Sequence, residues 1–296
     1  MDTQQLLVVI LSLFSTVLHS VGFVLLWRAK KVTNQYNKSQ TLYLLHLSFT
    51  ETLYSISGSL RILANVINRP DAELWVFIGS SGVFIQLTMI LIALTFDRYL
   101  AVRYNLRYLL IWTTKKTTIV IASIYFINIL FTILSINFLH SIQQAYDVFS
   151  QFAWLPLDGV FVTVALLAYG YILHKIAQRK LSLNETESSR TSSSNHKRRR
   201  KPFLMVLALI LSFTIFVVVP DIVALVFNRQ NKEMSQSVEL YLSFSFRAGI
   251  IVDFFIYVFG CREVRLMLKK CLRRDRNNNR DTVFVNGYTT RTTTHK

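Results

Sequence analysis

Apolar runs alternate with short polar segments along the whole length of the chain. Each run is long enough to cross a bilayer as a helix, which takes about 20 residues. The runs cover residues 5–27, 41–66, 73–100, 117–138, 152–175, 203–227 and 238–260. Soluble domains rarely contain apolar stretches of this length, so their repetition predicts an all-α membrane protein built as a bundle of seven transmembrane helices.

The polar segments between the runs differ in charge. Most of the 33 Lys and Arg residues lie in four of them, at 28–38, 103–116, 175–201 and 262–296. Basic residues collect on the cytoplasmic side of membrane proteins. We therefore expect the N-terminus to lie outside the cell and the C-terminus inside.

The overall composition agrees with a membrane protein. Hydrophobic residues make up 52% of the 296 residues, charged residues only 17%, and the mean hydropathy is +0.38. The net charge of +17 could also indicate a nucleic-acid partner. Because the basic residues lie between apolar runs, we expect the lipid bilayer as a partner and no nucleic acid.

Two polar segments, 181–201 and 273–296, cannot bury enough apolar surface to order themselves. We therefore predict one membrane domain over residues 1–272, with a flexible inner loop at 181–201 and a flexible tail at 273–296. Between 261 and 274, the spacing of apolar and basic residues is typical of a short amphipathic helix on the inner leaflet. Cys271 in this helix could carry a palmitoyl chain or remain a free thiol.

The stretch "LTFDRYLAVRY" at residues 94–104 places Asp97 and Arg98 directly after the uncharged run 74–96. An ion pair at the end of a membrane helix has two explanations. The two side chains could simply reach the interface, which requires no partner protein. Alternatively, the pair could serve a partner that docks at this end of the helix.

Seven spans, an outer N-terminus and this Asp-Arg-Tyr sequence at the inner end of span three resemble the rhodopsin-like (class A) G-protein-coupled receptors, over roughly residues 5–272. The resemblance implies a plasma-membrane receptor that acts on a heterotrimeric G protein, with arrestin and receptor kinases as further partners. It also implies that Asp97 restrains Arg98 until activation frees the arginine. The residues at the family's coupling and activation positions are Asp97, Arg98, Tyr99, Leu106, Tyr169 and Tyr257.

The chain also departs from the family pattern. Pro220 stands at the position of the family's kink proline in span six, but Val218 stands where a tryptophan usually precedes it. In the sequence "DFFIY" of span seven, Phe254 replaces the proline of the family's Asn-Pro-x-x-Tyr motif. The only cysteines, Cys261 and Cys271, lie near the C-terminus, so the family's outer disulfide cannot form. These differences predict a divergent receptor.

Four charged residues fall in the outer half of the predicted bundle: Arg61, Asp158, Asp221 and Arg247. Charges inside a membrane are costly unless they are paired or hydrated, so these residues are candidates for a ligand pocket. They could equally pair with one another, because their charges cancel. Ser80 is a further pocket candidate, and it stands where amine receptors carry an aspartate, which disfavours a biogenic amine.

Arg247 lies near the position at which opsins place their retinal lysine. A guanidinium group stays protonated and forms no Schiff base, so we expect no covalently bound retinal. The segment before the first span is too short to form a domain. We therefore expect the ligand to be a small molecule or a short peptide that reaches into the bundle.

The resemblance brings three ionisable residues together in the middle of the bundle. Glu51 stands where the family has an aspartate, and Asp253 and His19 stand at asparagine positions. In relatives these positions line one water-filled pocket that often holds sodium. Two carboxylates in such a site need compensation, which a shared proton, a sodium ion or a protonated His19 could supply. Alternatively, the side chains point apart and bond separately to backbone or water.

Two other classes of protein remain as alternatives. A transporter or proton-conducting bundle also carries ionisable residues in the membrane, but an odd number of spans does not divide into two equal repeats. A membrane enzyme needs a catalytic or metal-binding motif, and the six histidines are scattered, with no His-Glu-x-x-His sequence. We therefore expect no enzymatic activity and no cofactor apart from the possible sodium ion.

Overall fold

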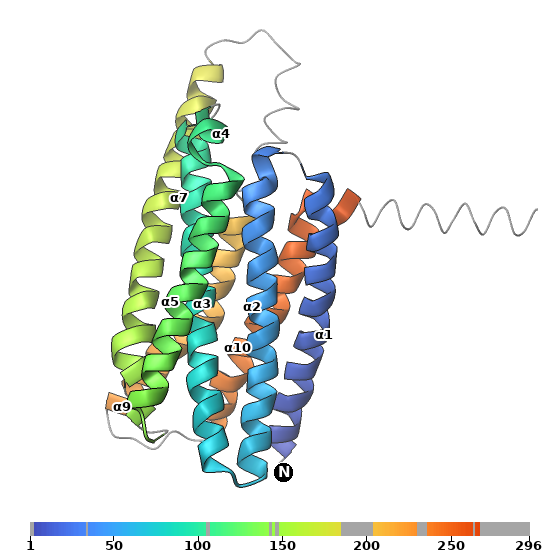
Figure 1. Cartoon of the computed structure of the whole chain (residues 1–296). Helices are drawn as coiled ribbons and strands as arrows, with labels where there is room; N and C mark the ends of the chain where they lie inside the picture. Colours follow the sequence, from blue (N-terminus) through green and yellow to red (C-terminus); the bar gives the residue numbers. More distant parts are fainter. Residues whose placement is uncertain are drawn as a thin grey trace, which may run out of the picture.

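The structure is a computed structural model of the chain. It describes residues 3–33, 35–104, 107–141, 144–145, 148–184, 204–229, 236–262 and 264–266. Within these residues every regular element is a helix, and the long helices lie side by side in one elongated bundle (Figure 1).

Helices cover all of the predicted apolar runs wherever the structure describes them. The long helices are α1 (Thr3–Val32), α2 (Gln35–Val66), α3 (Pro70–Tyr104), α5 (Thr114–Phe138), α7 (Leu155–Asn184) and α10 (Gln236–Gly260). The shorter elements are α4 (Tyr108–Ile111), the π-helical turns η2 (Phe149–Trp154) and η3 (Thr214–Val218), and α9 (Val219–Arg229). The turn η3 joins helical residues 204–213 to α9.

Two of the predicted boundaries can be compared with the structure. Helix α7 continues to Asn184, so the start of the predicted flexible loop at 181–201 is helical. At the other end of the chain, residues 264–266 are helical. The remainder of the predicted amphipathic helix, Cys271 and the predicted tail at 273–296 lie outside the described residues.

Five helical segments of the described chain are long and apolar enough to cross a membrane. They are Leu6–Lys31, Pro70–Tyr104, Thr114–Phe138, Leu155–Lys175 and Leu204–Phe227. Helices α2 and α10 have comparable lengths, 32 and 25 residues, but both carry charged residues at their centres.

Both π-helical turns end two residues before a proline. Pro156 follows η2 after one intervening residue, and Pro220 follows η3 in the same way. Proline lacks a backbone N–H, and its ring clashes with the carbonyl group four residues earlier. The wider π turn accommodates both defects without ending the helix.

The distribution of polar and apolar side chains is the reverse of that in a soluble protein. Leu166, Leu167 and Phe126 expose about 70% of their surface on the outside of the bundle, whereas His19 and Glu51 expose none. An apolar exterior around a polar interior suits a protein whose solvent is lipid. The interior therefore contains the residues that can carry chemistry.

Helix α1 packs against α2 and α10 through one buried seam. The seam residues recur at alternating spacings of three and four, and they are Ser12, Ser15, His19, Gly22, Leu26 and Ala29. Small residues allow two helix backbones to approach closely. A Cβ atom on Gly22 would lie 3.2 Å from both the Phe254 ring and the Ser48 hydroxyl, so glycine permits this contact.

Candidate functional site

The C-terminal end of α3 holds a fully buried ion pair. Asp97 and Arg98 are both 0% exposed, and Arg98 donates from Nε to Asp97 Oδ2 at 2.9 Å and from Nη2 to the same oxygen. Arg98 also donates from Nη1 to Gln40 Oε1 on α2, at 2.9 Å. Because the pair is buried and hydrogen-bonded, it is not an interfacial pair that reaches for water.

The second oxygen of the Asp97 carboxylate connects the ion pair to three other helices through hydrogen bonds. Asp97 Oδ1 accepts hydrogen bonds from Ser39 Oγ at 2.7 Å and from Tyr108 OH at 2.6 Å. Ser39 Oγ also lies 2.7 Å from Thr117 Oγ1. The pair is thereby anchored to α2, α4 and α5 as well as to its own helix.

Tyr108 lies in the short helix α4, outside the membrane spans, and is 1% exposed. Burial raises the pKa of its phenol, and the neighbouring Asp97 carboxylate raises it further. The phenol therefore remains a neutral donor to Asp97 at physiological pH. Sequence reasoning did not single out Tyr108, Gln40 or Ser39, because nothing in their spacing shows that they meet Asp97.

Two other predicted coupling residues, Tyr99 and Tyr169, lie on α3 and α7. The Tyr99 hydroxyl accepts a hydrogen bond from Arg103 Nη1 at 2.6 Å, and the Tyr99 ring packs edge-on against Tyr171 on α7. Tyr169 is buried on α7. Leu106 lies outside the described residues.

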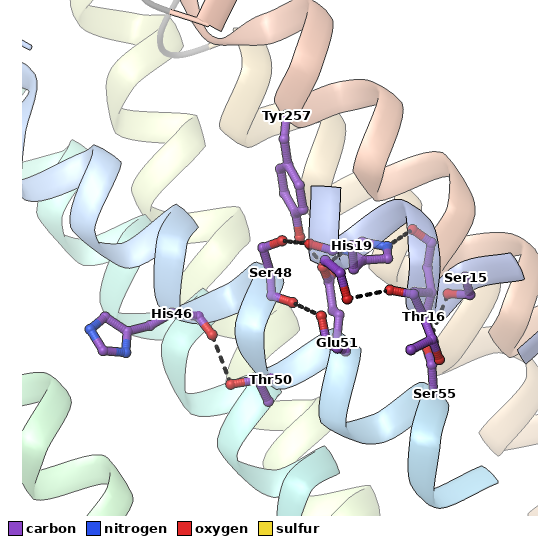
Figure 2. Close-up of polar contacts among 12 residues, drawn as sticks. Ser15, Thr16, His19, His46, Ser48, Thr50, Glu51, Ser55 and Tyr257 are labelled. Atoms are coloured by element: carbon purple, nitrogen blue, oxygen red, sulfur yellow. Dashed lines mark hydrogen bonds and ion pairs between the residues drawn. The ribbon is translucent and has the colours of Figure 1, made fainter. Parts of the chain in front are cut away.

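A second polar cluster lies in the middle of the bundle, between α1, α2 and α10. His19 Nδ1 lies 2.9 Å from Glu51 Oε2, and Tyr257 OH donates to Glu51 Oε1 at 2.5 Å. Figure 2 shows these three side chains converging from three helices, whereas His46 points away from them. The structure therefore brings together the two predicted residues His19 and Glu51 and adds Tyr257, which sequence reasoning assigned to activation.

Hydrogen bonds to the backbone fix this cluster in place. The other ring nitrogen of His19, Nε2, lies 2.8 Å from the Ile250 carbonyl oxygen on α10. Ser48 Oγ donates to the His19 carbonyl oxygen at 3.0 Å. One turn along α1, the hydroxyls of Ser15 and Ser55 lie 3.0 Å apart. Three helices are thus tied together at the level of His19.

Asp253, the third predicted member of the group, is 7% exposed and lies beside Glu51 and Ser212. Its Oδ1 atom has no hydrogen-bond donor among the described residues. A cavity of about 20 Å³ adjoins it, large enough for one water molecule. Its lining consists of Tyr54, Phe84, Leu87, Ser212, Phe213, Val217, Phe246, Gly249, Ile250 and Asp253.

The two arginines among the predicted pocket residues have partners elsewhere. Arg61 Nε lies 3.7 Å from Glu73 Oε1, and its guanidinium group lies over the Phe77 ring. Arg247 donates from Nε to Ser12 Oγ at 2.8 Å. The first contact links α2 to α3, and the second links α10 to α1.

The two acids of the predicted pocket lie next to each other instead. Asp158 at the start of α7 and Asp221 at the start of α9 lie close enough for their carboxyl groups to interact. Asp158 is 2% exposed, and neither of its oxygens has a hydrogen-bond donor among the described residues. Ser80 donates to the Phe77 carbonyl oxygen of its own helix. In the described part of the chain, no group of three or more His, Cys, Asp or Glu side chains is arranged to hold a metal ion.

The comparison with known protein families identifies the class. Residues 21–258 match the family described as "7 transmembrane receptor (rhodopsin family)". The chain belongs to this family, which confirms the assignment drawn from the sequence: it is a membrane-embedded G-protein-coupled receptor. Members of this family are receptors in signal transduction and generally not enzymes. No individual curated protein matches the chain.

Proposed function

We propose that this receptor passes an extracellular signal to a heterotrimeric G protein through Arg98. One observation carries the proposal: Arg98 is held at the inner end of α3 by Asp97 and Gln40, contacts that a conformational change can exchange for contacts with a partner. A buried arginine has five donors in a fixed fork, which suits it to binding acceptors on another protein.

The proposed topology has seven crossings, with α2 and α10 completing the set. The plasma membrane is the proposed location, with the N-terminus outside. In Figure 1 the N-terminal end of α1 and the short helix α4 lie at opposite ends of the bundle. If the N-terminus is outside, the end that carries α4, Asp97 and Arg98 is the cytoplasmic side, and the G protein, arrestin and receptor kinases would bind there.

The proposed ligand is a small molecule or a short peptide that enters from the outer end. The Asp158 and Asp221 carboxyl groups support this proposal, because Asp158 is buried without a donor among the described residues. A buried acceptor without a partner is costly, and a ligand that supplies N–H or O–H donors would remove that cost. Arg61, Arg247 and Ser80 are further proposed contacts.

Replacing Arg98 by Ala tests the coupling. We expect G-protein nucleotide exchange in membranes to fall to background while the receptor still reaches the cell surface. The change Arg28→Ala is a matched control. Arg28 is an exposed arginine near the C-terminal end of α1, which lies at the same end of the bundle as α4 (Figure 1). Wild-type exchange in the Arg98→Ala receptor would refute coupling through this residue and would favour the transporter alternative.

A further inference from the structure

The cluster of His19, Glu51 and Asp253 occupies the place where the sequence resemblance implies a sodium ion. Whether sodium fits depends on the oxygen atoms that remain available there. A hard cation such as sodium needs several oxygen ligands at once. The contacts of each atom in the cluster therefore decide what compensates the carboxylates.

The hydrogen bond of His19 Nε2 determines where one proton lies. Its partner is the backbone carbonyl oxygen of Ile250, at 2.8 Å. A carbonyl oxygen only accepts hydrogen bonds, so Nε2 must carry a hydrogen. In a neutral imidazole the other nitrogen, Nδ1, is then a bare acceptor.

That other nitrogen lies 2.9 Å from Glu51 Oε2, and the two side chains are 0% and 1% exposed. A bare nitrogen and an ionised carboxylate at this distance would bring two lone pairs together in a dry interior. The contact therefore contains a second proton. The two atoms do not meet the geometry of a hydrogen bond, so attraction between an imidazolium and a carboxylate accounts for the contact better than a neutral hydrogen bond.

The remaining oxygen of Glu51 is also occupied. Tyr257 OH donates to Oε1 at 2.5 Å, so each carboxylate oxygen has a close neighbour, and Glu51 is not among the residues that line the cavity. The cavity offers Asp253 Oδ1 and the Ser212 hydroxyl, but most of its lining is apolar and its volume is about 20 Å³. The arrangement does not fit the several oxygen ligands that a sodium ion requires.

We propose that the proton held between His19 and Glu51 takes the place of sodium in this receptor, so that α1, rather than an ion from solution, supplies the positive charge at the centre of the bundle. The ionisable groups that face the pair are Asp253 and Tyr257, both on α10, within the described residues. The inference concerns an internal binding site and does not depend on which G protein is coupled.

Sodium dependence of thermal unfolding tests the proposal on the purified wild-type receptor in detergent. The melting temperature is measured at constant ionic strength in sodium chloride and in N-methyl-D-glucamine chloride. We expect equal values in the two salts. A higher melting temperature in sodium, lost in the Asp253→Asn receptor, would show that sodium binds and would overturn the proposal.

The His19→Asn receptor is the matched variant. Removing the imidazole leaves Glu51 and Asp253 without an internal cation, so we expect the variant to melt at a lower temperature than the wild type and to gain stabilisation by sodium. The change His46→Asn is a control, since His46 points away from the cluster (Figure 2). The same small loss in both variants would contradict a special role for His19.

Nitrogen-15 NMR of histidine-labelled receptor in bilayers reports the protons directly. We expect His19, assigned by the signal lost in His19→Gln, to show hydrogens on both ring nitrogens at neutral pH. A signal typical of a bare ring nitrogen at His19 would overturn the proposal. Neither the melting curves nor the spectra involve a G protein, so their outcome is separate from that of the coupling experiment.

Discussion

Arg98 is held by Asp97, its neighbour in the chain, and by Gln40 on another helix. Gln40 is 4% exposed and accepts from Arg98 Nη1 at 2.9 Å. A hydrogen bond between a neutral and a charged group contributes about 1.5–3 kcal/mol. Gln40 therefore contributes substantially to holding Arg98 in place.

The change Gln40→Leu removes this acceptor and nearly preserves the volume of the side chain. If Arg98 is the coupling residue, we expect basal nucleotide exchange to rise, because about 1.4 kcal/mol corresponds to a tenfold change in an equilibrium. The change Gln40→Glu should have the opposite effect, since a carboxylate holds the guanidinium group more tightly. Basal exchange that moves in the same direction in both variants would contradict a restraining role for Gln40.

At the scale of elements, the two π-helical turns place prolines inside long helices without breaking them. The turn η3 packs against α10 at Gly249, where an added Cβ would lie 2.7 Å from Phe216 Cβ. A Cβ atom is fixed to its backbone and cannot move aside as a side-chain tip can. The approach of these two elements therefore requires glycine at position 249.

The change Gly249→Ala should lower stability by about 1–3 kcal/mol through overpacking. Gly79→Ala is its control, because a Cβ there meets nothing within 4 Å and alanine favours a helix by about 1 kcal/mol over glycine. Thermal unfolding of the two purified variants checks the difference. If Gly249→Ala melted at or above the temperature of Gly79→Ala, the close contact between η3 and α10 would be wrong.

At the scale of the whole molecule, the charges are divided between two ends and a centre. One end of the bundle holds Asp97 and Arg98, the centre holds His19 and Glu51, and the other end holds the carboxyl pair that includes Asp158. Each group joins at least two helices. A displacement of one helix against another must therefore rearrange one or more of these buried contacts, which suits a protein that transmits a signal across the membrane.

The proposed orientation can be measured on intact cells. An epitope placed before residue 1 should bind antibody without permeabilisation, and an epitope after residue 296 only after it, because the basic segments hold the C-terminal side in the cytoplasm. An epitope inserted within residues 185–201 should behave like the C-terminal one. The reverse labelling pattern would contradict the orientation drawn from the charges.

The sequence by itself determined the class of fold and the family. The apolar runs alone predict the membrane helices, because about 20 apolar residues can be satisfied in lipid only as a helix. The position of Asp97 and Arg98 at the end of one run was enough to indicate the family, which the match over residues 21–258 confirms. Both features depend on which residues follow one another within a short segment, and the sequence contains that information in full.

The partners of the buried charges were decided only by tertiary structure. The sequence allowed Asp158 to pair with an arginine, but it lies beside Asp221, while Arg61 lies near Glu73. It left open whether His19, Glu51 and Asp253 meet at all, and it gave no sign of Gln40 or Tyr108 beside the ion pair. Spacing along a helix fixes which face a residue occupies, but the rotation and depth at which helices pack fix which faces meet. Those two quantities are set by the shapes of all the packed side chains together, including a glycine such as Gly22, and not by any one segment of the chain.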